Sequence, residues 1–275
     1  MRRKLRLLLW VTNMRVGLKI EYDGTAYGGW QRQKNVPSIQ QTIEEALEKT
    51  LSCTCRLTGA GRTDAGVHAY GQVAHFDIST HIPAERFSYI LNQQLPADIR
   101  IVQSWQAAED FHARRDAVGK HYRYTIYQAP HASALERNSS MHVPQPLDAA
   151  AMQQAAQVLK GEHDFSAFRT VGSNIIGTVR NVYRLEVLQR GRHIYINIWG
   201  NGFLYNMVRI IAGTLIAVGK GKIPVQEIQS ILDSKERARA GATAPAKGLA
   251  MCEVFYGAEK LEKSLSECGK SLDSI

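Results

Sequence analysis

The chain has 275 residues, 44% of them hydrophobic, so it can bury a full core without disulfides or a structural metal. Lys and Arg total 34 against 25 Asp and Glu, and the formal charge of +9 favours a polyanionic partner such as RNA. A merely basic soluble protein is the alternative on charge alone. The four cysteines match neither a zinc-finger spacing nor a C-x-x-C motif, which predicts reduced thiols in a cytoplasmic protein.

The first residues are basic and apolar with no period that fits a strand or a helix. Their apolar run, residues 7–11, is shorter than the roughly seven to fifteen residues of a secretory signal, and no small-residue cleavage site follows. We therefore expect residues 1–13 to be a disordered extension. From Val16 to Tyr22, apolar side chains alternate with small or polar ones, which predicts a half-buried strand.

The rest of the first half mixes helices and strands. Ser38 and Gln41 have the spacing of a capping box, which predicts a helix whose apolar face holds Ile39, Ile43, Ala46, Leu47 and Leu51. A glycine-rich loop follows. Beyond it we expect a strand over Gln72–Ile78, a helix over Ala84–Leu95 and a strand over Ile99–Trp105.

The second half repeats this mixture. Residues 203–218 are apolar almost all round, which predicts a buried helix, and Arg209 within them argues against a bilayer span. The other elements expected are strands over Lys120–Tyr127, Val179–Leu188, His193–Trp199 and Ala250–Tyr256, and helices over Asp148–Lys160 and Val225–Asp233. Because strands sit beside hairpin turns rather than in strict βαβ order, we predict an α+β fold with largely antiparallel sheet.

The most informative segment is the loop over residues 59–69, Gly-Ala-Gly-Arg-Thr-Asp-Ala-Gly-Val-His-Ala. Glycine permits positive φ and close backbone approach, so the three glycines predict a tightly folded loop that presents Arg62 and Asp64. A nearby arginine lowers a carboxylate pKa and so keeps the group ionised. An ionised carboxylate can act as a nucleophile or a base, whereas a plain turn aspartate would bond to its own backbone.

The run Gly-Arg-Thr-Asp-Ala-Gly-Val-His at residues 61–68 resembles the catalytic loop of the TruA family of tRNA pseudouridine synthases. Further segments of that family follow in order: Glu21–Thr25, Gly29–Gln33, Asp110–Arg114, Tyr122–Tyr124, Asp164–Phe165, Val179–Asn181 and Met207–Arg209. The resemblance covers residues 14–257. It implies the pseudouridine synthase fold, in which two α/β halves, residues 14–113 with the catalytic loop and residues 114–257, meet at a central cleft. Residues 258–275 would form a C-terminal tail.

The same resemblance implies an activity and the residues that perform it. The protein would isomerise uridine to pseudouridine in the anticodon stem-loop of tRNA, at positions 38–40, as a homodimer without cofactor or metal. Asp64 would be the nucleophile, adding to the base or capturing C1′ of the ribose. Arg62 would hold the flipped-out state of the target nucleotide, and Tyr122 would stack on its base. Arg209 would pair with Asp64, and Leu249 would line the uracil pocket.

Residue patterns support part of this assignment and leave alternatives open. A buried Arg209 would cost several kcal/mol unless an anion pairs with it, although a rotated helix could bring its long side chain to water. Tyr122 lies in an alternating strand, where an aromatic residue can equally belong to the core. Arg32 and Arg123 lie among aromatic residues, a mixture that suits contacts with RNA phosphates and unpaired bases.

The competing hypothesis is a noncatalytic RNA-binding or tRNA-folding protein on the same scaffold. Such a protein would keep the basic surface and would tolerate replacement of Asp64, whereas an enzyme would not. A hydrolase is less consistent with the sequence, which has neither a clear metal cluster nor a Ser-His-Asp arrangement.

Overall fold

The computed structural model describes residues 12–170 and 177–267. The strands are β1 (Thr12–Tyr22), β2 (Thr58–Gly59), β3 (His68–Thr80), β4 (Ile99–Ala107), β5 (Gly119–Gln128), β6 (Met141–Val143), β7 (Gly161–Asp164), β8 (Val179–Arg190), β9 (His193–Gly200) and β10 (Leu249–Phe255). The helices are α1 (Ile39–Leu51), α2 (Phe87–Asn92), α3 (Ala149–Val158), α4 (Met207–Gly219), α5 (Glu227–Ser234) and α6 (Ala258–Ser266).

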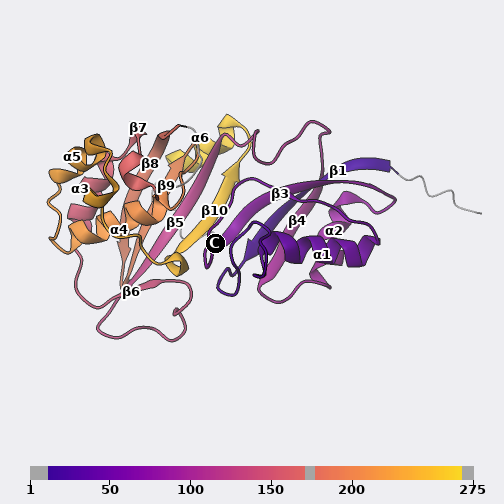
Figure 1. Ribbon diagram of the computed structural model, residues 1–275, viewed down its shortest axis with the longest axis horizontal. Helices are drawn as coiled ribbons and strands as arrows, with labels where there is room; N and C mark the ends of the chain where they lie inside the picture. The colour runs from indigo at the N-terminus through magenta and orange to yellow at the C-terminus, as the bar shows by residue number, and fades with distance from the viewer. Residues whose placement is uncertain (1–11, 171–176, 268–275) are drawn as a thin grey trace, which may run out of the picture.

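All these strands form one sheet (Figure 1), with the order β4-β1-β3-β10-β5-β9-β8-β7 and with β2 and β6 added beside β3 and β5. Among the described strands, only the β3–β10 and β5–β6 pairings are parallel. The predicted α+β fold with largely antiparallel sheet is therefore confirmed. β10, from near the end of the chain, lies between β3 and β5, so one continuous sheet joins the two halves.

Helix α1 forms where the capping pattern predicted it. The Ser38 hydroxyl oxygen accepts a hydrogen bond from the Gln41 backbone N–H at 3.3 Å. Ile39, Ile43 and Leu47 are fully buried, so the apolar stripe covers the sheet as expected. This packing fixes α1 beside the segment that leads through β2 into the glycine-rich loop.

Helix α4 begins four residues later than the sequence predicted. Its N-cap, Asn206, has φ of 60°, a left-handed conformation that cannot continue a helix. Residues 203–206 are therefore a loop. The helix expected over 84–95 is shorter too, since a 3₁₀ turn at Ala84–Arg86 precedes α2. The short strands β6 and β7 were not predicted, because three or four residues carry too little pattern.

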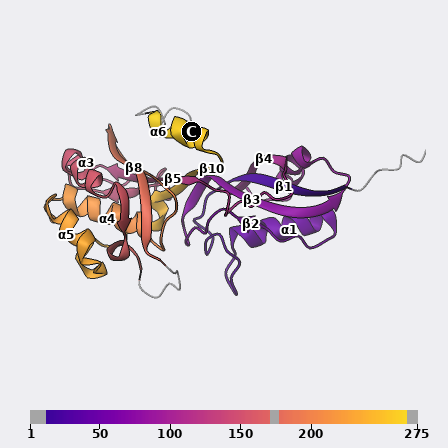
Figure 2. The ribbon, with the colours of Figure 1, turned by 90° about the horizontal axis from the view of Figure 1, so that it is seen from above.

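Both ends of the fold extend beyond the expected boundaries. Thr12 and Asn13, expected in a disordered extension, pair with Thr80 and Ser79 because β3 is long enough to offer partners. Residues 1–11 lie outside the described residues. At the other end, the segment expected to be a tail contains α6, whose Leu261 packs on a small apolar cluster. Figure 2 shows α6 on the opposite side of the sheet from α1.

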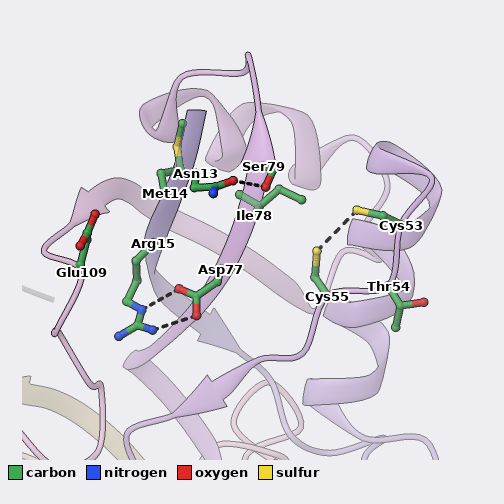
Figure 3. A pocket seen from close by; sticks show the side chains of 10 residues that line it. All are labelled: Asn13, Met14, Arg15, Cys53, Thr54, Cys55, Asp77, Ile78, Ser79 and Glu109. Carbon is green, nitrogen blue, oxygen red and sulfur yellow. Dashed lines mark hydrogen bonds and ion pairs between the residues drawn. The ribbon is translucent and has the colours of Figure 1, made fainter. Parts of the chain in front are cut away.

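A hollow of about 620 Å³ lies where β1 and β3 pass the segment after α1 (Figure 3). Arg15 and Asp77 form a cross-strand ion pair there, with Nε and Oδ1 2.7 Å apart. The thiols of Cys53 and Cys55 are free, as is that of Cys252, in agreement with the spacing argument. Cys268 lies outside the described residues.

The close packing of α4 against the 240–245 segment yields a stability prediction. A Cβ atom on Gly213 would lie 1.7 Å from the Ala242 carbonyl oxygen, so Gly213→Ala must push the helix away from the 240–245 segment. We expect a loss of about 1–3 kcal/mol in the free energy of unfolding, measured by urea denaturation. Gly202→Ala is the control, because its nearest neighbour would be 4.0 Å away. An unchanged midpoint for Gly213→Ala would contradict this packing.

The start of the chain yields a second prediction. Thr12 and Asn13 are exposed at the end of β1, so a chain that begins at Met14 should lose little buried surface. We expect its melting temperature to stay within a few degrees of the full chain, as measured by circular dichroism. Aggregation of the shortened chain would show that residues before Met14 stabilise the fold.

Candidate active site

A cavity of about 1000 Å³ is lined by both halves of the chain, as a central cleft requires. The first half contributes residues from the loops around Gly28–Gln33 and Gly61–Val67. The second half contributes Lys120 and Tyr122 of β5, the loop before α4, and Leu249 at the start of β10. β3, β10 and β5 are neighbours in the sheet, which brings these distant segments together.

The glycine-rich loop is held by hydrogen bonds to its backbone. The Gln72 side chain donates a hydrogen bond to the Gly61 carbonyl oxygen at 2.8 Å. The backbone N–H of Trp30 donates one to the Thr63 carbonyl oxygen at 3.0 Å. The Thr63 hydroxyl is 2.8 Å from that of Tyr22. Gly66 adopts φ of 76°, which only glycine accepts readily. The loop is tightly folded as predicted, and it holds Asp64 at a defined position.

Asp64 and Arg209 meet across the cavity. Arg209 Nη1 lies 3.4 Å from Asp64 Oδ2, and the two side chains are 18% and 25% exposed respectively. The same guanidinium donates from Nε to the Ala244 carbonyl oxygen and from Nη1 to Asn206 Oδ1, both at 2.8 Å. The arginine in the apolar helix is thus paired with an anion, as its burial requires.

The surroundings that set the pKa of Asp64 differ from the expectation. Burial raises the pKa of Asp64 above its usual value, and the positive charge of Arg209 opposes this rise. The expectation that Arg62 would hold the carboxylate ionised is wrong. Arg62 is exposed at the cavity wall, because the loop buries Gly61 and Thr63 on either side of it.

Tyr122 and Leu249 form the apolar part of the cavity. Tyr122 is 7% exposed, and its ring meets that of Phe203 edge to face, with centroids 5.2 Å apart. Burial raises the pKa of the Tyr122 hydroxyl, which keeps it neutral. Leu249 is buried. The structure therefore brings all five predicted site residues to one cavity: Asp64, Arg62, Tyr122, Arg209 and Leu249.

Some residues of the cavity were missed by the sequence analysis. Asn206 accepts a hydrogen bond from Arg209 and so orients it. The sequence did contain a signal for this residue, because asparagine tolerates the left-handed backbone that Asn206 adopts before the helix. Phe203 packs on Tyr122 but lay within the expected helix. Lys120 lies two residues before Tyr122 in the same strand, so alternation alone places both on one face.

The aromatic residues near basic ones are mostly core. Arg123 is only 7% exposed, donates from Nε to Asn197 Oδ1 at 3.0 Å and lies over the Tyr195 ring. Its expected role in phosphate contacts is therefore wrong, because β5 is covered on both faces. Arg32 has a side chain 56% exposed, pairs with Glu44 and lines the cavity, so its phosphate contact stays a prediction.

Within residues 12–170 and 177–267, no group of three or more His, Cys, Asp and Glu side chains could hold a metal ion. In the same part of the chain, no helix combines the length and the apolar character needed to cross a membrane.

Comparisons with known proteins agree with this arrangement. A family model described as tRNA pseudouridine synthase matches residues 19–116 and 155–257. The tRNA pseudouridine synthase A of Ruminiclostridium cellulolyticum is 53% identical over 243 residues, which cover 88% of this chain and 99% of that protein. That of Acetivibrio thermocellus is 51% identical over 241 residues, with the same coverage. A chain of the archaeal box H/ACA sRNP Nop10-Cbf5 complex, at 12% identity, covers 92% of this chain and 49% of its own length with a TM-score of 0.32, too low to bear on the site.

The ion pair yields a prediction for Arg209→Leu. The leucine removes the charge that opposes the pKa rise of Asp64, so this pKa should rise further and less carboxylate should be ionised at a given acidic pH. It also leaves the Ala244 carbonyl oxygen without its donor, at a cost of about 1–3 kcal/mol in unfolding free energy.

A carboxyl-carbon NMR titration, with Asp64→Asn to assign the signal, measures the first effect. Arg209→Lys, which keeps the charge, is the control for it. A titration of Asp64 that is the same in the leucine variant as in the unmodified protein would show that Arg209 does not act on this carboxylate.

Proposed function

This chain belongs to the tRNA pseudouridine synthase family, and on that premise we propose that it isomerises uridine to pseudouridine in tRNA with Asp64 as the nucleophile. One observation carries the residue assignment. Asp64 is the carboxylate that the folded loop presents to a cavity lined by both halves, opposite a partly buried arginine.

The reaction needs a nucleophile but no change of redox state. The bond from N1 of uracil to C1′ of the ribose breaks, the base turns, and a bond from C5 to C1′ forms. C5 loses its proton, and N1 gains one, so the atoms balance within the nucleotide. Asp64 can serve either by adding to the base or by capturing C1′, because both routes use the same carboxylate.

The other cavity residues suit a nucleotide that has left its helix. Arg62 is exposed at the cavity wall, where its long side chain can occupy the space of the extruded base. Tyr122 and Leu249 offer an aromatic ring and an aliphatic side chain against uracil. Arg209 holds Asp64 in position.

We extend the proposal to the substrate and the assembly. The anticodon stem-loop is the expected site of modification, the working form is a homodimer, and the compartment is the cytoplasm. The first two features rest on the resemblance of the Gly61–His68 motif and its companion segments, and the compartment rests on the cysteine spacing. The formal charge of +9 supports a polyanionic substrate in general.

The central test is Asp64→Asn, which keeps the shape of the side chain and removes the nucleophile. We expect tritium release from tRNA labelled at C5 of uridine to fall by more than about 10³-fold under single-turnover conditions. Affinity for the same tRNA should change little, because phosphate contacts supply most of it.

Asp233→Asn is a matched control, since Asp233 is an exposed residue of α5. Near-normal release by Asp64→Asn would exclude Asp64 as the nucleophile. A tRNA that neither the unmodified protein nor the control variant converts would instead count against the enzymatic function.

A further inference from the structure

Lys120 lies in the wall of the cavity and holds the catalytic loop. Its Nζ donates a hydrogen bond to the Ala60 carbonyl oxygen at 2.8 Å. A Cβ atom on Gly61 would come within 3.2 Å of the same Nζ, so the lysine and the loop are in close contact. Lys120 and Tyr122 project from the same face of β5, and both line the cavity that Asp64 also lines.

The electrostatic surroundings of Lys120 are unfavourable for a cation. Within the described residues, no ion pair joins Lys120 to a carboxylate, and the side chains whose charges act on it are Arg114 and Arg180. Burial and these two positive charges lower the pKa of Lys120 to about 8. A partly buried ammonium with two cationic neighbours requires an anion from outside the chain to stabilise it.

We infer that Lys120, together with Arg114, forms a subsite for one backbone phosphate of the RNA next to the target uridine. Both side chains line the cavity, and Lys120 has two N–H groups left after its bond to Ala60. The subsite rests on the proposed function, because it assumes that RNA enters this cavity. The subsite would link RNA binding directly to the catalytic loop, since the Lys120 ammonium that binds the phosphate also donates a hydrogen bond to that loop.

A phosphate fits this place better than a base. Lysine is a compact point charge with rotatable donors, suited to a phosphate oxygen and less to the flat edge of uracil. Tyr122 and Leu249 already provide the apolar surface for the base. A phosphate also supplies the negative charge that the three basic side chains lack.

The first test measures the affinity of a tRNA stem-loop by fluorescence anisotropy from pH 7 to pH 9. The charged form of Lys120 binds phosphate, and this form is lost as the pH rises through about 8. Affinity of the unmodified protein should therefore fall about tenfold over this range. Lys120→Arg should not show this fall, because arginine stays charged.

The other titratable or charged groups that line the cavity or act on Lys120 are the same in both proteins: Arg32, Arg62, Asp64, Arg114, Tyr122, Arg180, Tyr205 and Arg209. A difference between the two pH profiles thus isolates Lys120. Identical profiles for the lysine and arginine proteins would overturn the proposal.

The second test identifies the phosphate. Stem-loops that carry a single uncharged methylphosphonate on the 5′ or the 3′ side of the target uridine are compared with the unmodified RNA. At one of these positions, the methylphosphonate should weaken binding to the unmodified protein about tenfold and binding to Lys120→Met hardly at all. Lys222→Met, at an exposed position three residues after the end of α4, is the matched control and should keep the full effect.

Additive losses for Lys120→Met and both methylphosphonates would show that Lys120 contacts neither phosphate, and the subsite would be wrong. Because binding is measured, this result is separate from a failure of the enzymatic function. That failure would appear as an absence of pseudouridine in RNA treated with the unmodified protein.

Discussion

The ion pair between Asp64 and Arg209 is the contact on which the arrangement of the site depends. Asp64 comes from the loop before β3, and Arg209 from the first turn of α4, 145 residues later in the chain. A partly buried carboxylate and a partly buried guanidinium each cost free energy alone, and pairing them offsets part of that cost. The pair therefore fixes where the second half must place its most apolar helix relative to the catalytic loop.

The sheet makes that placement possible. β10 pairs with β3 on one side and with β5 on the other, so strands from both halves of the chain lie side by side next to the cavity. Ala244, just before β10, accepts a hydrogen bond from the Arg209 side chain. β10 and the segment just before it thus join the two halves and orient Arg209, which faces Asp64.

The cavity combines an apolar surface with an excess of positive charge. Burial makes Asp64 harder to ionise and lowers the pKa of Lys120, so both groups are in a state that a bound nucleotide changes. In the proposed complex, a phosphate would restore the charge balance around Lys120, and uracil would lie beside Tyr122.

The sequence by itself determined the α+β class and helix α1, because alternation and a cap are local signals. The unbroken motif and the resemblance that it carries named five residues that the fold brings to one cavity. The sequence misplaced the start of α4, the expected effect of Arg62 on the pKa of Asp64 and the role of Arg123. Those depend on a left-handed Asn206, on an exposed loop position and on burial of β5 from both faces. The resemblance implied that Arg209 pairs with Asp64, and the tertiary structure gave the geometry of that pair. Only the tertiary structure set Lys120 beside the loop, since contacts across more than 50 residues leave no local pattern.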